Sequence, residues 1–305
     1  MAVIQSLSLK VSNENPDCSL EQLGSESQRY KTTRAIIDRG LQLFERSDMR
    51  EWLVLTARET VIGFRGSELE SLWPLGQRRD TTLPEMPSFI DSFLQELRRE
   101  FLEIRLSRNL KGEAAVTREE WAVEQVSPTV HSWRSRYLGY MILSGDIINC
   151  MVSTRNLATW RSFMFQMTVS VAHEVAHLLT AVLSSGKIRS TPKKMKTGSC
   201  EGEAGFFFEM KAFGGIAEFY ASISRPDDTQ QPGIPYMIKG TGLKDLGVEL
   251  SEETIQEFVE DINNVNLPLI PDDIGSLPGV TTREEIQKNT AGLVMSLRNN
   301  SAEVP

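Results

Sequence analysis

Two of the three histidines in this 305-residue chain lie four residues apart, in the segment His173-Glu174-Val175-Ala176-His177. Positions i and i+4 share one face of an α-helix, so both imidazoles can bind one ion from the same side. Glu174 follows His173 directly and projects close to that face, where it can contact a water molecule on the ion. Zinc accepts nitrogen and oxygen ligands near tetrahedral geometry and keeps one position open in catalytic sites. The spacing therefore predicts a Zn²⁺ site with His173 and His177 as ligands and Glu174 as the general base.

The alternative is a chance match of two buried histidines. It would leave the Glu174 carboxylate in an apolar segment without a positive partner, which is unfavourable. A bound zinc ion removes this difficulty, so we favour the metal site.

A catalytic zinc ion usually has three protein ligands, so a third ligand must lie elsewhere in the chain. The metzincin pattern HExxHxxGxxH is excluded, because residues 178–183 (LLTAVL) contain neither the glycine nor a third histidine. The other common solution is a glutamate on a following helix, and residues 200–220 contain four: Glu201, Glu203, Glu209 and Glu218. Glu203 is the best candidate, because its glycine and alanine neighbours let two helices approach closely.

Other roles for these carboxylates stay open. Glu203 also fits an acidic residue at a helix N-terminus, where the helix dipole favours negative charge. Glu209 could accept a hydrogen bond from a ligating imidazole, because ligating histidines nearly always have such a partner. Glu209 and Glu218 also fit charges on a helix surface or in a salt bridge.

A developing oxyanion would need a further hydrogen-bond donor. The candidates are His131, Tyr137 and Tyr140. The two tyrosines lie in an expected strand. If this strand forms the edge of the active-site cleft, it could bind a peptide as an additional strand. The alternatives are a structural histidine and tyrosines that are packed in the core.

Hydrophobic periodicity and capping residues predict the helices that position these residues. One long helix is expected over residues 157–183, with Gly186 as its C-terminal stop. A second buried helix is expected over residues 203–222. Four further helices are expected: over residues 33–46, over residues 88–106, from Ser251 and from Thr282.

Strands are expected over residues 51–64 and in a hairpin, whose segments YLGYMIL (137–143) and DIINCMV (146–152) flank a turn. Together the elements indicate an α+β fold with a mostly antiparallel sheet, a long buried active-site helix and a helical C-terminal part. No obvious linker divides the chain, so we expect one domain over residues 29–305. Residues 1–28 are polar and rich in turn formers, and we expect them to be loosely ordered.

Three segments, HEVAH (173–177), GEAG (202–205) and FGGIAEFY (213–220), carry a resemblance to known proteins. HExxH followed by a glutamate on the next helix resembles the gluzincin type of zincin metallopeptidase, although the NExxSD sequence of gluzincins is absent. The three segments together are similar to a group of fungal HExxH metallopeptidase-like proteins with GE[AS]G and FGGxxEFY at similar spacing. The similar region runs from Leu157 to Tyr220. The resemblance implies a zincin-like fold and a zinc site.

Composition restricts the partners and the location. The net charge of −8 argues against a nucleic-acid binder, which would carry a basic surface. The apolar run from Phe163 to Leu183 could span a bilayer, but polar residues such as Gln166 and Glu174 inside it make that unfavourable. Three widely spaced cysteines form no disulfide framework, and the first twenty residues lack a secretory signal. We expect a cytoplasmic protein without nucleic-acid or membrane partners.

The predicted function is hydrolysis of a peptide or amide bond by a zinc-bound water, with Glu174 as general base. One alternative keeps the zinc ion in a zincin-fold enzyme that tailors a small molecule, as in fungal secondary metabolism. Another alternative is a regulatory or binding module with a non-catalytic zinc ion. The presence of Glu174 argues against this module, because a structural site needs no base. The expected partner is thus a peptide or a small-molecule substrate.

Overall fold

The computed structural model describes residues 7–63, 84–110, 115–119, 135, 138–183, 196–197, 200–201, 203–224, 231–240 and 242–296. Within these residues the helices are α1 (Gln28–Leu43), α2 (Ser47–Gly63), α3 (Met86–Arg99), α4 (Gly145–Ser153), α5 (Leu157–Leu183), α6 (Ala204–Ala212), α7 (Glu252–Glu260) and α8 (Arg283–Lys288). The strands are β1 (Val11–Glu14), β2 (Leu20–Gln22), β3 (Glu103–Ser107), β4 (Ala115–Glu119), β5 (Gly139–Ser144), β6 (Lys196–Thr197), β7 (Cys200–Glu201), β8 (Ile216–Tyr220), β9 (Ile234–Ile238), β10 (Leu246–Glu249), β11 (Thr281–Thr282) and β12 (Leu293–Ser296).

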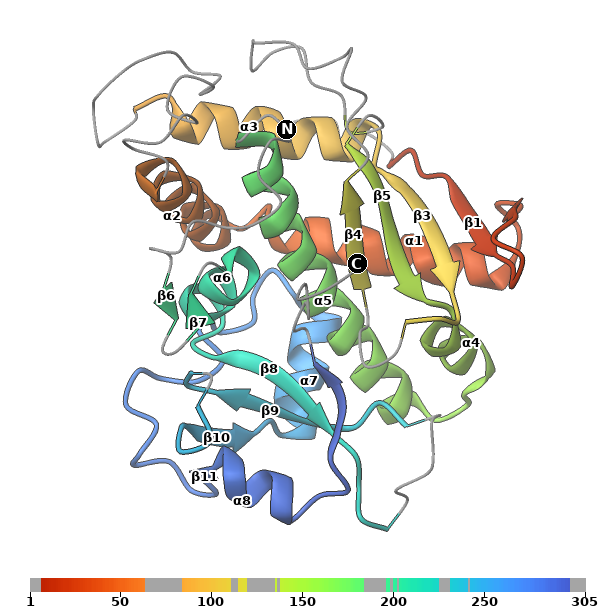
Figure 1. Cartoon of the computed structure of the whole chain (residues 1–305). Helices are drawn as coiled ribbons and strands as arrows, with labels where there is room; N and C mark the ends of the chain where they lie inside the picture. Colours follow the sequence, from red (N-terminus) through yellow and green to blue (C-terminus); the bar gives the residue numbers. More distant parts are fainter. Residues whose placement is uncertain are drawn as a thin grey trace.

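The first sheet is mixed and has the strand order β2-β1-β3-β5-β4 (Figure 1). β1, β3 and β5 run parallel, and β2 and β4 pair antiparallel at the two edges. Residues 1–28, which the sequence predicts to be loosely ordered, contain β1 and β2 in their described part. Val11 of β1 is buried in the core, so this strand is packed into the sheet.

The second sheet has the strand order β11-β10-β9-β8-β12 and is antiparallel throughout. The prediction of a helical C-terminal part is therefore wrong, although the two expected helices are present as α7 and α8. Their N-caps are the expected residues, because the hydroxyls of Ser251 and Thr282 each accept a hydrogen bond from a backbone N–H of the first turn. The two short strands β6 and β7 also pair antiparallel. The chain is thus a mixed α/β protein, and among the described strands the expectation of antiparallel pairing fails only in the first sheet.

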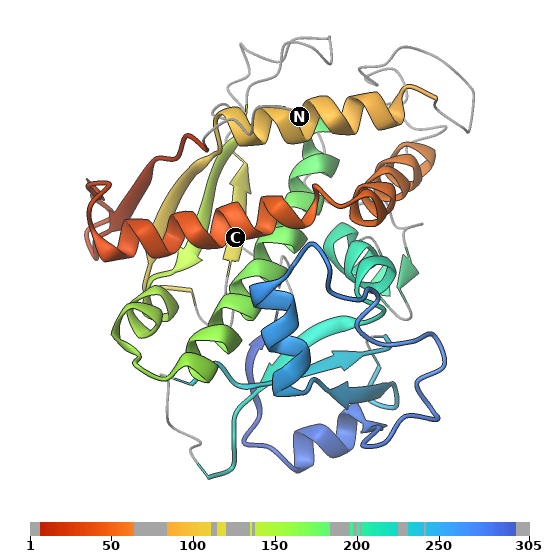
Figure 2. The same cartoon turned by 180° about the vertical axis from the view of Figure 1, so that it is seen from behind.

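α5 lies between the two five-stranded sheets (Figures 1 and 2). Its bounds are the predicted ones, and from Phe163 to Leu183 every residue except His177 is buried. A helix that is hydrophobic all round requires such burial. The Phe165 ring packs against Phe258 of α7, with ring centroids 4.9 Å apart, and against Phe219 of β8 at 6.1 Å. α5 also packs against β4 of the first sheet, so one helix contacts both sheets.

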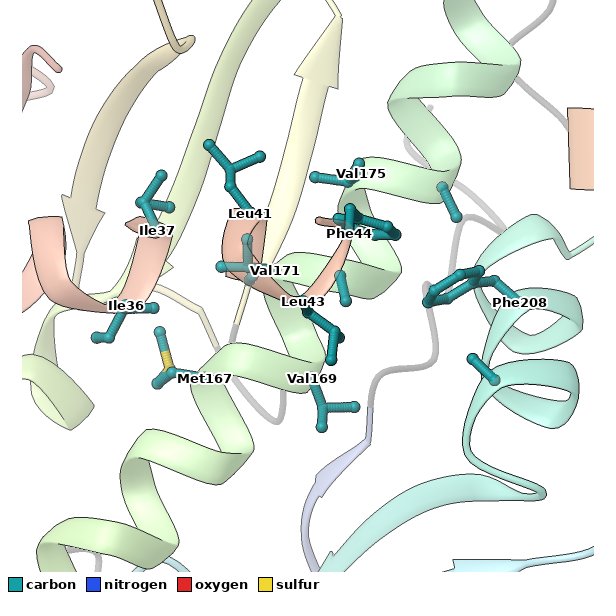
Figure 3. Close-up of a cluster of buried hydrophobic side chains, with 14 of the residues drawn as sticks. Ile36, Ile37, Leu41, Leu43, Phe44, Met167, Val169, Val171, Val175 and Phe208 are labelled. Carbon is teal, nitrogen blue, oxygen red and sulfur yellow. The ribbon is translucent and has the colours of Figure 1, made fainter. Parts of the chain in front are cut away.

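α1 crosses α5 closely, and apolar side chains from both helices form a cluster with Phe208 of α6 (Figure 3). Gly40 of α1 makes this approach possible. A Cβ atom at Gly40 would lie 2.6 Å from Cγ1 of Val171, well inside van der Waals contact. The glycine inside the predicted helix is therefore explained by the packing of α1 on α5.

The strand expected over residues 51–64 is wrong, because residues 51–63, the described part of this segment, belong to the helix α2. Leu53, Ala57 and Thr60 are buried at helical spacing. The hydroxyls of Thr56 and Thr60 donate to the carbonyl oxygens four residues before them, an arrangement that only a helix provides. The β-branched residues of this segment are thus accommodated by local hydrogen bonds and by burial.

Two further predictions need correction beside β5. Residues 146–152 form α4 instead of a hairpin strand, because the Ser144 hydroxyl accepts a hydrogen bond from the Ile147 N–H and caps the helix. The helix expected over residues 88–106 ends at Arg99, and residues 103–107 form β3. β3 gains backbone hydrogen bonds to strands on both of its sides, and a helix could not form these bonds.

The helix expected over residues 203–222 is wrong in its second half. α6 ends at Ala212, and Gly214 has a φ of +84°, in the left-handed region where helices commonly end. A Cβ atom at this glycine would lie 2.3 Å from the carbonyl oxygen of Ile270, so a side chain is also excluded by contact. The chain then continues as β8 in the second sheet.

Within the described parts of the chain, no helix combines the length and the apolar character that crossing a membrane requires.

Candidate metal centre

α5 and α6 bring the three predicted metal ligands together. His173 and His177 lie one turn apart on α5, and Glu203 immediately precedes α6. The Nε2 atoms of the two histidines are 3.2 Å apart, and Oε1 of Glu203 is 3.6 Å from Nε2 of His173 and in direct contact with Nε2 of His177. The ligand atoms of a tetrahedral zinc ion at ~2.1 Å would lie about 3.4 Å apart. The three residues form a group that could bind a metal ion.

Glu203 acts at the same time as the N-cap of α6. Its Oε2 accepts a hydrogen bond of 2.5 Å from the N–H of Phe206, while Oε1 faces the histidines. The two roles considered for this residue, metal ligand and helix N-terminal acid, are therefore compatible in one side chain. The cap also fixes the carboxylate, because one oxygen is held by the helix while the other stays available.

The donor set fits a cation. Nδ1 of His173 lies 2.6 Å from Oε1 of Glu209, so a neutral His173 would donate through Nδ1 and present the Nε2 lone pair. That lone pair faces Nε2 of His177 and Oε1 of Glu203. Oε1 of Glu203 is buried and lies beside both Nε2 ring nitrogens. Three electron-pair donors that point at one place require a positive charge between them.

The electrostatics of the site lead to the same requirement. Burial alone would lower the pKa of the His173 imidazole, but the carboxylates of Glu203 and Glu209 raise it more, to about 9. Burial would raise the pKa of Glu203, but the adjacent His177 and His173 lower it to about 2. The carboxylate of Glu174 also raises the pKa of both histidines, so it acts on the same small volume. Glu174 itself is buried, with 3% of its surface exposed.

Gly205 allows α6 to lie directly on the His173 ring. A Cβ atom at this glycine would be 2.3 Å from Cε1 and 2.4 Å from each ring nitrogen of His173. Phe206 packs its ring edge against the same imidazole, with centroids 5.2 Å apart. The sequence indicated that the small residues of GEAG permit close helix approach, but it did not identify Gly205 and Phe206 as contacts of a candidate metal ligand.

Glu209 connects the candidate metal centre with the second sheet. Its carboxylate is fully buried, with one oxygen beside His173 and the other accepting a 2.9 Å hydrogen bond from the Ala217 N–H of β8. Burial raises the pKa of Glu209, and the hydrogen bonds from His173 and Ala217 oppose this effect. The role of Ala217 was missed, since a backbone donor across a turn leaves no signal in the sequence.

Glu218 lies outside this site. Its carboxylate forms a buried ion pair with Arg283 of α8 and accepts a hydrogen bond from the Tyr220 hydroxyl. This is the salt-bridge role that the sequence left open for Glu218. The pair joins β8 to α8.

The structure does not place the remaining candidates at the metal centre. Tyr140 lies on β5, and the Arg105 guanidinium carbon is 3.4 Å from the centre of its ring. β5 is an internal strand between β3 and β4, so the expectation that Tyr140 lies on a strand at the cleft edge is wrong. His131 and Tyr137 lie outside the described residues. The same holds for the side chain of Glu201, although its backbone belongs to β7.

Comparison of the chain with protein-family models, with curated proteins and with solved structures gave no match. The resemblance to gluzincins therefore stays a prediction.

Proposed function

We propose that this protein is a zinc-dependent hydrolase that cleaves peptide or amide bonds. The observation that carries the proposal is the convergence of His173, His177 and Glu203 from two helices, beside the buried carboxylate of Glu174. Two imidazoles and one carboxylate are a ligand set that catalytic zinc ions use.

Exposure supports a catalytic role over a purely structural one. Structural zinc sites are closed by four protein ligands, whereas catalytic sites keep a position open. The described residues supply three ligands, and the side chains of His177 and Glu203 are 20% and 15% exposed, while that of His173 is fully buried. The site is thus accessible from the side of His177, where a substrate carbonyl could enter.

Each residue has a defined task in the proposed reaction. His173, His177 and Glu203 would hold the zinc ion, which on binding polarises a carbonyl group and lowers the pKa of water. Glu174 takes one proton from the attacking water and passes it to the nitrogen of the leaving amine as the C–N bond breaks. Glu209 holds the His173 ring in one tautomer and orientation.

The arrangement of the first sheet supports a peptide as substrate. β4 packs against α5 and is an edge strand among the described strands (Figure 1). An edge strand can pair with an extended peptide through backbone hydrogen bonds. We further infer a zincin-like fold from this edge strand beside a helix with HExxH, followed by a helix that supplies the third ligand.

The test combines metal analysis with a conservative substitution of the base. Purified wild type, Glu174→Gln and Glu257→Gln would be analysed for bound zinc and incubated with a complex peptide library, whose cleavage products are identified by mass spectrometry. Glu257 is exposed on α7 and serves as the control for loss of a carboxylate. We expect cleavage by wild type and the control, and a loss of at least about 100-fold in Glu174→Gln with zinc retained.

Three results would count against the proposal. If wild-type protein has no affinity for zinc, the proposed metal site is excluded. If it binds zinc but cleaves no peptide, the proposed peptidase activity is excluded. If wild type and Glu174→Gln cleave equally, Glu174 is excluded as the general base.

A further inference from the structure

A second site is suggested by a pocket of about 240 Å³ at the carboxyl ends of the parallel strands β1 and β3, beside the start of α1. Its lining includes Asn13 and Glu14 of β1, Leu106 of β3, Arg108 and, from α1, Arg29. In open sheets with parallel strands, ligands bind at the carboxyl ends of the strands. None of the lining residues belongs to α5 or α6, so the inference does not rest on the proposed function.

Asn13 places a polar group where the sheet would otherwise continue its apolar face. Val11 and Asn13 share one face of β1, and Val11 is buried in the core. Asn13 pairs in register with Leu106, which is also buried. The side-chain oxygen of Asn13 is buried and has no hydrogen-bond partner in the described part of the chain. A buried acceptor in a pocket calls for a donor from a ligand or from solvent.

Arg29 supplies the complementary donor. Its Nε atom is buried and also lacks a hydrogen-bond partner within the described ranges. Burial and the positive charge of Arg108 lower the pKa of Arg29, while Glu21 and Asp146 act in the opposite direction. Arg108 is exposed and only loosely paired, because its Nε lies 3.8 Å from the Asp146 carboxylate. Two guanidinium groups at one pocket favour an anionic group such as a carboxylate.

Glu14 narrows the class of ligand. Glu14 follows Asn13 in β1 and also lines the pocket, and its negative charge at this end of the strand would repel a ligand with several negative charges. The amide oxygen of Asn13 offers an acceptor to an ammonium group, and the charge of Glu14 favours a positive group nearby. The volume lies below the roughly 300–1,000 Å³ of pockets that hold drug-sized ligands, so the ligand must be small.

We propose that this pocket binds a free amino acid, with Arg29 and Arg108 holding the carboxylate, with Asn13 accepting from the ammonium group, and with the charge of Glu14 favouring that group. The ligand would satisfy both buried polar atoms that lack partners, the oxygen of Asn13 and Nε of Arg29.

The test is calorimetric titration of the full chain with each of the twenty common amino acids and with acetate. The protein is used after removal of zinc with a chelator, so that the candidate metal centre cannot bind the carboxylate. We expect saturable binding of at least one amino acid and at least tenfold weaker binding of acetate, which lacks the ammonium group. Arg29→Met and Asn13→Leu should each weaken the binding at least about tenfold, because each removes a hydrogen bond to a charged group.

Arg34→Met is the matched control, because Arg34 is exposed on the same helix and does not line the pocket; its affinity should equal that of wild type. If Arg29→Met fails to fold, Arg108→Met decides, since its side chain is 74% exposed and contributes little packing. Absence of binding by any amino acid, undiminished binding in folded arginine variants, or equal affinity for acetate would each overturn the proposal. Failure of the proposed hydrolase would leave this binding unchanged.

Discussion

Replacing Gly205 by alanine should weaken zinc binding, because the added methyl group would overlap the imidazole of a ligand. The new Cβ atom would lie 2.3–2.4 Å from three ring atoms of His173, whereas ordinary contacts begin near 3.4 Å. The ring or the helix α6 must therefore move by about 1 Å, which exceeds the ~0.2 Å tolerance of metal–ligand distances. Loss of an outer contact of a ligand weakens metal binding about 10- to 100-fold, and displacement of the ligand itself should cost at least as much.

Gly205→Ala should also change the stability of the protein. Alanine in place of glycine inside a helix usually stabilises by up to about 1 kcal/mol. Overpacking of a core usually destabilises by about 1–3 kcal/mol. His173 is fully buried between α5 and α6, so we expect the overlap to dominate and the variant to unfold at a lower urea concentration than wild type.

Gly40→Ala is the matched control for this experiment. The added Cβ atom at Gly40 would lie 2.6 Å from Cγ1 of Val171, which is on α5 like His173. It would not contact a candidate metal ligand. We expect both variants to lose stability, and Gly205→Ala alone to lose zinc affinity, measured by competition with a zinc indicator. If Gly205→Ala binds zinc as tightly as wild type, overlap with the His173 ring does not weaken zinc binding. The same conclusion follows if Gly40→Ala loses as much zinc affinity as Gly205→Ala.

Three further predictions concern Glu209, the proton of His173 and the separate ion pair of Glu218 with Arg283. Glu209→Gln should weaken zinc binding about 10- to 100-fold in the same competition assay, and unchanged affinity would show that Glu209 does not orient His173. In zinc-free protein the pKa of His173 is raised from 6.5 to about 9, so the folded state binds the proton more tightly than the unfolded state. This protonation contributes up to about 3 kcal/mol to the free energy of unfolding, in full below pH 6.5, and the contribution is lost as the pH rises through 9. The unfolding temperature of zinc-free protein should therefore fall over that pH range, and an unfolding temperature that does not change with pH would contradict the prediction. Arg283→Met removes the positive charge that pairs with the buried Glu218 carboxylate and should reduce the free energy of unfolding by about 3–5 kcal/mol. An accompanying loss of zinc affinity would contradict the separation of this ion pair from the metal centre.

The sequence predicted best where local pattern and burial agree. The apolar run of α5 has helical length and no glycine or proline, and its observed bounds, Leu157 and Leu183, match the prediction. The spacing of His173 and His177 depends only on the helical repeat, so it needed no knowledge of the fold. The caps at Ser251 and Thr282 likewise depend on side chains that bind backbone within one turn.

The secondary-structure predictions were wrong where one local sequence permits two structures. Ser144-Gly145-Asp146 fits a hairpin turn and also the start of a helix, and the hydroxyl cap on Ile147 selects the helix α4. Residues 103–107 continue the apolar pattern of α3, yet they form β3 because β1 and β5 offer hydrogen bonds on both sides. These partner strands lie far away in the sequence, so a periodicity confined to the segment could not detect them.

The three candidate ligands meet in the structure although the extent of the helix that follows Glu203 was predicted wrongly. Glu203 precedes a helix of only nine residues, and the choice of Glu203 depended on small neighbours that permit contact with α5. That requirement concerns the first turn alone, so it holds whether the chain continues as a helix or as β8. The turn at Gly214 then returns the Ala217 N–H to Glu209, which holds His173. The second sheet therefore helps to orient the candidate metal ligand His173 through the carboxylate of Glu209. No local sequence pattern predicts the hydrogen bond between Glu209 and the Ala217 backbone.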